Sequence, residues 1–456
     1  MSQINARDLY RICDPSITLN YADPEDRKYY TDFSEVRSGG IIEEIKQEIS
    51  WSDKCTCQLF TGHIGCGKST ELRRLQSMLE TEGFHVIYFE SDRDLEIGDV
   101  DISDILISIA RQVNDDLTKN LAEPETHRFK SILEGAVKIL TTEVGVKYES
   151  PEIPGAGKVS LDTDKKELSL SSVFGKLTVA AKNSPEVRSR LRQYLEPRTN
   201  SILETINQEL FEPAVETLKQ KGRQGLVIIV DNLDRVESTV KPTGRTQPEY
   251  LFADRGNQLK GLNCHIIYTI PLGLRFSNEY SRLKQRFGYT PRVLTMVPVR
   301  HRDGTEHEKG MSMFRQMILR RAFPGDEPEE RLLRVKEIFE DRHTLDRLCS
   351  VSGGHVRNLL MLLHTAINKQ KALPVSAGVL EDVILEQQND MTLAISDDEW
   401  DMLRQVKKNK KVSGDEQYQQ MLRSMFVFEY YDNEKKESWF DVNPFIAGAK
   451  ELGYES

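Results

Sequence analysis

A glycine-rich segment of eight residues constrains the fold of this 456-residue chain more than any other feature. Residues 62–69 read GHIGCGKS and match the pattern G-x-x-x-x-G-K-[ST] at every fixed position. The apolar, β-rich run CTCQLFTG leads into this segment, and STELRRLQSMLETEG continues it with the spacing of a helix that ends at Gly83. Strand, loop and helix in this order are the context in which such a loop binds phosphate groups. An ordinary glycine-rich turn is the alternative.

The residue types of this loop suit a nucleoside triphosphate. Glycines allow consecutive backbone N–H groups to turn toward the phosphates, and the start of the helix adds its positive end. We expect Lys68 to reach the β- and γ-phosphates and Ser69 to bind Mg²⁺. The predicted nucleotide-binding residues are Gly62, Ile64, Gly65, Cys66, Gly67, Lys68, Ser69 and Thr70. ATP and Mg²⁺ are therefore the predicted cofactors.

A second candidate site follows from the run GLVIIVDNLDRV at 225–236. A continuous apolar run of this length predicts a strand that is buried on both faces, and Asp231 ends it. A carboxylate at the end of such a strand, beside the phosphate loop, can hold the Mg²⁺ shell. We therefore predict Ser69 and Asp231 as the metal-binding residues, with a merely solvated Asp231 as the alternative.

The first 300 residues alternate strands and helices, which predicts a parallel sheet covered by helices. Four further apolar, strand-like runs lie at 84–91, 225–231, 264–271 and 292–299. The predicted fold class is α/β, with a core of five parallel strands, a helical lid domain and a C-terminal winged-helix domain. The predicted domains are an N-terminal lead-in at 1–50, an ATPase core at 51–300 with an insertion at 120–185, a lid at 301–380 and a winged-helix-like domain at 381–456.

The predicted insertion differs from its surroundings. Residues 158–172 alternate apolar and polar side chains around a charged turn, as a solvent-facing hairpin would. A long helix at about 186–220 then leads back to the sheet. The winged-helix prediction rests on helical patterns at 396–411 and 415–425, which two short strands follow.

The segment DNLDR at 231–235 resembles the extended second motif of STAND and related KAP-type ATPases. The resemblance to the STAND and AAA+ branches of the P-loop ATPases, which belong to the ASCE class, extends over residues 35–365. It implies a central strand between the two strands that carry the motifs. It also implies that Thr269, at the end of CHIIYTIP, is a polar sensor and that Arg357, in the segment GGHVR, reads the γ-phosphate from the lid. The alternatives are an ordinary β-branched strand residue and an arginine on a solvated helix face.

The same resemblance implies an arginine finger that acts across subunits. Three arginines follow the sensor strand, namely Arg275, Arg282 and Arg286, and the sequence does not distinguish them. A finger completes the site of a neighbouring copy, so a homo-oligomer is the predicted active form.

Hydrolysis needs a group that orients or deprotonates the attacking water. In AAA+ enzymes the residue after the strand-end aspartate is usually glutamate, and here it is Asn232. This departure predicts slow turnover. Asp234 is the best substitute, with a purely structural aspartate as the alternative. The full set of predicted catalytic residues is Lys68, Asp231, Asp234, Thr269 and Arg357.

Charge and composition bear on partners and location. The formal net charge of -10 disfavours a general polyanion binder, because non-specific affinity for nucleic acids comes from Lys and Arg. Residues 396–456 hold 9 Lys or Arg against 13 Asp or Glu, which favours protein contact over DNA for the winged helix. We find no apolar run of membrane-spanning length and no signal-peptide core, so we expect a cytoplasmic protein without membrane contact.

Two functions fit these features. The first is a slowly hydrolysing, ATP-controlled switch that assembles or signals to a partner effector protein, and the STAND resemblance implies roles that include bacterial anti-phage defence. The second is a DNA-associated AAA+ ATPase of the origin-binding or transposition-regulator type. A kinase that uses the same loop is disfavoured, since the sequence lacks an acceptor-site signature.

Overall fold

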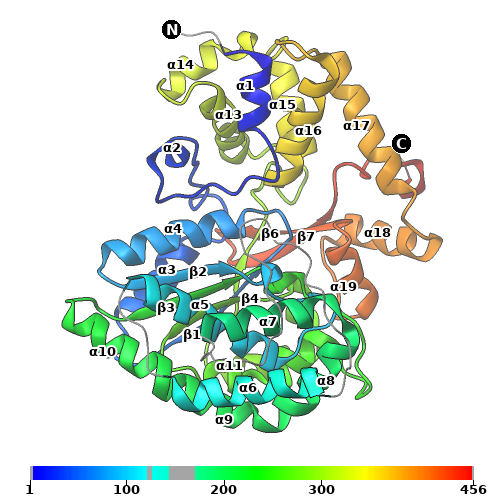
Figure 1. The fold of residues 1–456 in the computed structure, drawn as a ribbon. Helices are drawn as coiled ribbons and strands as arrows, with labels where there is room; N and C mark the ends of the chain where they lie inside the picture. Colours follow the sequence, from blue (N-terminus) through cyan, green and yellow to red (C-terminus); the bar gives the residue numbers. More distant parts are fainter. Residues whose placement is uncertain (1–3, 121–125, 143–169, 454–456) are drawn as a thin grey trace. The chain divides into compact units, whose positions relative to one another are not determined.

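The core of the fold is a parallel sheet of five strands, as the sequence predicts (Figure 1). This computed structural model describes residues 4–120, 126–142 and 170–453. The strands are β1 (Cys57–Gly62), β2 (His85–Glu90), β3 (Leu226–Asp231), β4 (His265–Thr269) and β5 (Arg292–Leu294), in the sheet order β2-β3-β4-β1-β5. β4 therefore lies between β3 and β1, the two strands that carry the motifs, as the resemblance implied. The α/β fold class is confirmed.

The apolar runs that predict the central strands are fully buried. Every residue of β1 and β3 is buried, which is the pattern of strands covered on both faces. β2 pairs with β3 over its whole length, in a register that sets Glu90 opposite Asp231. The predicted strand at 292–299 is paired only as far as Leu294. Beyond it, the N–H groups of Met296 and Val297 donate to the carbonyls of Glu429 and Gly354 instead of to a neighbouring strand of the five-stranded sheet.

The chain forms two compact units. The first unit comprises Met1–Trp51, Gln58–Thr81 and Thr269–Ser456. The second unit comprises Ser52–Cys57 and Glu82–Tyr268. β5 and all of β1 except Cys57 belong to the first unit, whereas β2 and β3 belong to the second.

The first unit is built mostly from helices. Its N-terminal helices are α1 (Ala6–Ile12), α2 (Pro24–Arg27), α3 (Ile41–Ser50) and α4 (Lys68–Thr81), and α12 (Tyr280–Phe287) follows β4. The predicted lid region contains α13 (Glu308–Ala322), α14 (Pro328–Leu333), α15 (Arg342–Val351) and α16 (Val356–Gln370). The helix α17 (Ala377–Thr392) runs across the predicted boundary at residue 380. Their apolar faces share one core with α1, which packs on α13 and α16.

The C-terminal part of the first unit has the predicted layout of helices followed by a hairpin. It contains α18 (Asp397–Asn409), α19 (Glu416–Arg423) and the antiparallel pair β6 (Val427–Asp432) and β7 (Glu437–Val442). Trp400 and Phe440 are buried in the core of this part, as expected for packing residues.

The second unit packs helices around β2, β3 and β4. They are α5 (Ile102–Asn120), α6 (His127–Thr142), α7 (Leu170–Asn183), α8 (Pro185–Leu195), α9 (Thr199–Ile206), α10 (Glu212–Gln220) and α11 (Gly256–Lys260). The predicted hairpin at 158–172 lies almost wholly outside the described residues, and from Leu170 the chain is helical. The single long helix predicted at 186–220 is wrong. The α-helix is interrupted at the 3₁₀ turn Glu196–Arg198, where Pro197 has no N–H to donate.

Within the described parts of the chain, every helix is too short or too polar to span a bilayer.

Candidate nucleotide site

The phosphate loop of the first unit connects β1 to α4, as the motif predicts. Gly62 ends the strand and Lys68 begins the helix. The Lys68 side chain is buried, and its ammonium donates hydrogen bonds to the carbonyls of Gly62 at 2.9 Å and His63 at 2.8 Å. A bound phosphate would compete with these two carbonyls for the ammonium. The loop therefore holds its cation at the place where the motif requires it.

The N-terminal lead-in contacts the same loop through a buried cation. The Arg37 guanidinium donates to the Cys66 carbonyl at 2.8 Å and pairs with the Glu71 carboxylate of α4 at 3.1 Å. The Tyr30 hydroxyl donates to Glu71 as well, at 3.2 Å. Because all three side chains are buried, these residues fix the end of the loop against the start of α4. The sequence offered no motif by which Arg37 could be recognised.

The start of α16 contacts the middle of the loop. His355 caps this helix, accepting from the Asn358 N–H at Nδ1, and its Nε2 donates to the Ile64 carbonyl at 2.8 Å. The Arg357 N–H donates to the Gly65 carbonyl at 3.2 Å, while the Arg357 side chain is exposed. The segment GGHVR thus touches the loop through its histidine and its backbone.

Gly65 is tightly confined by this contact. Its φ is +85°, and a Cβ at this position would lie 2.8 Å from Cε1 of His355. Any larger residue would be strained by its backbone and would clash with the ring.

The C-terminal hairpin also contacts the loop, which the sequence did not predict. The Glu429 N–H of β6 donates to Nε2 of His63 at 3.0 Å. The Phe428 ring is stacked on His355, with ring centroids 5.7 Å apart. The Tyr430 hydroxyl donates to the Gly353 carbonyl at 2.7 Å. Three consecutive residues of β6 therefore contact the phosphate loop and the start of the lid helix.

An ion pair anchors this part of the hairpin. The fully buried Glu429 carboxylate pairs with Arg275, and Arg275 also donates to the Ser438 hydroxyl at 3.2 Å. Of the three finger candidates, Arg275 is therefore engaged within its own unit. Arg282 and Arg286 lie on α12, where Arg282 pairs with Glu279 at 3.3 Å.

We expect the protein to lose stability as the pH falls below about 6.5. Burial lowers the pKa of His63 to about 3 and the pKa of His355 to about 4. Unfolded histidines titrate near 6.5, so below that pH the unfolded state binds protons that the folded state does not. Stability that is present above pH 6.5 is thus lost progressively toward the folded pKa values. Each ring accounts for a loss of about 2 kcal/mol between pH 6.5 and pH 5.

Urea unfolding at pH 7 and at pH 5 measures this loss. Relative to the wild type, His355→Gln should show a smaller difference between the two pH values, whereas His343→Gln, which replaces an exposed histidine, should leave the difference unchanged. An equal pH dependence in all three proteins would contradict the assignment.

In the second unit, Asp231 ends β3 as a buried carboxylate. Its Oδ2 accepts from the Tyr88 hydroxyl at 2.6 Å, and its Oδ1 accepts from the Asn232 N–H at 2.7 Å. Asn232 adopts a left-handed conformation with φ +65°, and its side chain turns to Asp92. Asp234 lies half-buried in the 3₁₀ turn η4 (Leu233–Arg235) that follows.

The donor types present fit a Mg²⁺ ion that arrives with a nucleotide. Among the residues that the structure describes, no group of three or more His, Cys, Asp or Glu is placed to hold a metal ion alone. A nucleotide-borne Mg²⁺ does not need such a group, because phosphate oxygens and water fill most of its positions. Asp231 offers a carboxylate, and Ser69 offers a hydroxyl in the first turn of α4.

The remaining predicted residues lie on the expected elements. Thr269 is buried at the carboxyl end of β4, and Thr70 lies in the first turn of α4. Ile64 is partly exposed in the loop that connects β1 to α4.

The sheet and the loop define this chain as a P-loop protein of the α/β class. No protein-family model and no curated protein matches its sequence. The chain is similar to the solved structure of the Aeropyrum pernix ORC2 protein in ADPNP-ADP complexes, with 12% identity over 97% of this chain and 95% of that one, and a TM-score of 0.42.

Two further similar structures have a TM-score of 0.36. One is the A. pernix ORC1 protein in complex with DNA, with 14% identity over 97% of this chain and 94% of that one. The other is Cdc6p from Pyrobaculum aerophilum, with 10% identity over 97% of this chain and 96% of that one.

Proposed function

We propose that this protein is an ATPase of the AAA+ or STAND type that binds ATP·Mg²⁺ and hydrolyses it slowly. One observation supports this proposal above the others. A complete phosphate loop, with its lysine buried among its own carbonyls, follows β1 of a parallel sheet in which another strand ends at a buried aspartate. The carboxyl ends of parallel strands lie at one edge of a sheet, which is where such folds bind nucleotides.

In this proposal the residues have separate roles. Lys68 binds the β- and γ-phosphates, while Ser69 and Asp231 hold Mg²⁺, which neutralises charge on the phosphate oxygens when it is bound. Thr269 senses the γ-phosphate from β4, and Arg357 contacts it from the lid. Asp234 is the candidate that the sequence offers for orienting the attacking water.

We further propose that the bound nucleotide controls the lid and the C-terminal hairpin. The carbonyls of Gly62 and His63 accept from Lys68, and the same loop is contacted by His355 and by β6. A phosphate that draws Lys68 and the loop N–H groups toward itself changes the loop to which these segments are bonded. This supports a nucleotide-controlled switch that acts through self-assembly or a protein partner. Signalling in anti-phage defence stays a prediction from the resemblance.

A DNA-associated ATPase is the second candidate. It is favoured by the layout of α18, α19 and the β6–β7 hairpin, which is that of a winged helix. Lys435 and Lys436 are exposed in the turn of the hairpin, where a wing would meet phosphates. The acidic start of α19, with Asp415 and Glu416, opposes entry of this helix into a groove.

The mass in solution and the rate of ATP turnover test both candidates. Each is measured without nucleotide, with ADP·Mg²⁺ and with ATP·Mg²⁺, in the presence and absence of duplex DNA. Assembly that requires ATP and is indifferent to DNA supports the switch. A persistent monomer whose turnover rises with DNA supports the second candidate. Absence of any ATP binding overturns both.

A further inference from the structure

The residue that follows Asp231 cannot take up a proton. Asn232 carries an amide in place of the usual carboxylate, and the structure shows where this amide points. Its Nδ2 donates to Oδ1 of Asp92 at 2.9 Å, while its backbone N–H donates to Asp231. Asn232 thus connects the strand-end aspartate to a second carboxylate.

Asp92 lies at the carboxyl end of the neighbouring strand. It belongs to the 3₁₀ turn η1 (Ser91–Arg93), which directly follows β2. β2 and β3 are paired so that Glu90 is opposite Asp231, and Asp92 and Asn232 follow these two residues. The sheet register therefore brings Asp92 beside the candidate Mg²⁺ residue within the same unit.

The second oxygen of Asp92 is held by a partner that can leave. Oδ2 accepts from Arg235 at 2.6 Å, and the Arg235 side chain is 40% exposed. An ion pair of this exposure contributes little to stability, so it can open without disturbing the fold. Asn232 can keep Oδ1 oriented while Oδ2 becomes accessible.

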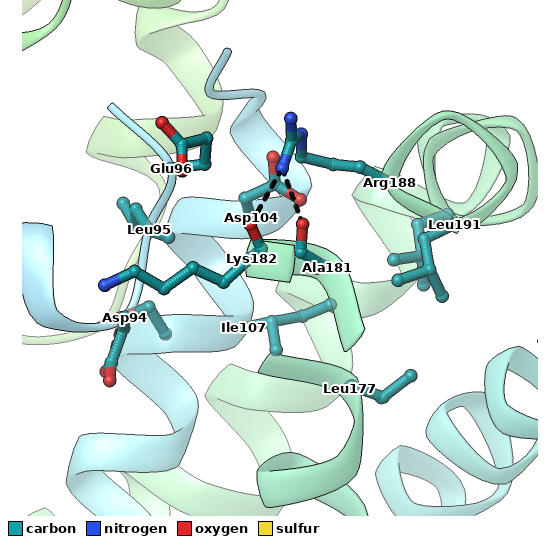
Figure 2. Close-up of a pocket in the computed structure, with 12 residues that line it drawn as sticks. Asp94, Leu95, Glu96, Asp104, Ile107, Leu177, Ala181, Lys182, Arg188 and Leu191 are labelled. Carbon is teal, nitrogen blue, oxygen red and sulfur yellow. Dashed lines mark hydrogen bonds between the residues drawn. The ribbon is translucent and has the colours of Figure 1, made fainter. Parts of the chain in front are cut away.

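The helical insertion braces the backbone of Asp92. Lys182 of α7 donates to the carbonyls of Asp92 and Arg93, both at 3.0 Å. Next to this contact, a cavity of about 40 Å³ lies between the segment after β2 and helices α5, α7 and α8. Figure 2 shows Arg188 in the lining of this cavity, where it donates to the carbonyls of Ala181 and Lys182. The cavity is too small for a nucleotide. Its two cationic side chains, Lys182 and Arg188, donate to backbone carbonyls of the protein.

We infer that Asp92, rather than Asp234, is the carboxylate that activates the water in ATP hydrolysis. This inference rests on the proposed ATPase function. The water oxygen forms a bond to the γ-phosphorus, and the bond from that phosphorus to the β,γ-bridging oxygen breaks. The electron pair of the broken bond leaves with ADP, and Asp92 accepts the proton of the water. The role of Asn232 is to orient Asp92.

Asp92→Asn tests the inference, because the amide oxygen can still accept from Asn232 while the basic carboxylate is lost. We expect kcat to fall about 100-fold, as for loss of a general base, with the Kd for ATP changed less than threefold. Asp234→Asn compares the two carboxylates, and a larger fall in kcat there than in Asp92→Asn would overturn the inference. Glu237→Gln, which replaces an exposed carboxylate shortly after η4, is the matched control and should keep kcat within threefold of the wild type. The double variant Asp92→Asn/Asn232→Glu, which exchanges amide and carboxylate between the strands, should regain at least tenfold over the single one.

The readouts separate this inference from the proposed function. ATP binding is measured with a fluorescent ATP analogue, and Lys68→Ala serves as the non-binding reference. A wild type that binds no ATP overturns the proposed function and the inference with it. A wild type that binds ATP without hydrolysing it overturns the inference and the hydrolysis in the proposed function, while ATP binding stands. The inference alone is overturned by an Asp92→Asn variant whose kcat is unchanged, or by one whose affinity for ATP falls as much as its kcat.

Discussion

Replacing Lys68 by alanine is expected to abolish ATP binding, with a Kd raised about 100-fold or more. The loss combines a cation and its charge-assisted hydrogen bonds to phosphate oxygens, each of which is worth about 1.5 to 3 kcal/mol. In the structure the ammonium already lies buried at the phosphate loop, where it donates to the Gly62 and His63 carbonyls that a phosphate would replace. Equilibrium binding of a fluorescent ATP analogue measures the effect directly.

Arg73→Ala provides the matched control, because it removes one cation from the same helix without touching the loop motif. It should leave the affinity within about twofold of the wild type. Saturating ATP·Mg²⁺ should also raise the Tm of the wild type and of Arg73→Ala, but not that of Lys68→Ala, because a ligand stabilises only the state that binds it. A Lys68→Ala protein that still binds ATP would remove the basis of the proposed function.

Replacing Arg275 by alanine is expected to produce the largest loss of stability, about 3 kcal/mol. The variant leaves the fully buried Glu429 carboxylate without its ion-pair partner, and an uncompensated buried charge is more costly than a lost surface pair. Because Arg275 itself is 24% exposed, the loss should lie at the lower end of the usual range for a broken buried ion pair. Urea unfolding at pH 7 measures the change in the free energy of unfolding.

The double variant Arg275→Ala/Glu429→Gln separates the buried charge from lost packing. Because glutamine carries no charge, the double variant should regain most of the stability that Arg275→Ala loses. If both variants are equally unstable, packing and not charge is the cause. Arg282→Ala, which removes an exposed pair on α12, should cost less than about 1 kcal/mol.

The sequence predicts the sheet well because its signals are local. Consecutive residues predict the strand, the phosphate loop and the helix that starts at Lys68. The length of the apolar run that ends at Asp231 predicts a buried strand. The same holds for the C-terminal helices and hairpin, whose apolar periodicity is strong. The helix at 186–220 was overextended because one proline, Pro197, interrupts an otherwise helical pattern.

The environment of the loop could not be predicted, since its partners are distant in the sequence. His63 is bonded to a backbone N–H 366 residues away, and Arg37 reaches the Cys66 carbonyl across 29 residues. Neither contact requires a particular local pattern. Asp92 was overlooked for a similar reason, because its relation to Asn232 depends on the pairing of two strands and not on any motif.

The motif allows any residue at the positions between Gly62 and Gly67, but in this chain two of these positions are constrained by contacts with distant residues. The His63 ring accepts a hydrogen bond from a backbone N–H of β6, and Gly65 has space only for a hydrogen atom beside His355. Natural variants should therefore change these positions together: a larger residue at 65 is expected only where position 355 has become smaller. The loop and residues 353–456 should therefore be inherited together. A chimera in which the loop and the C-terminal segment come from different proteins should therefore lose these contacts.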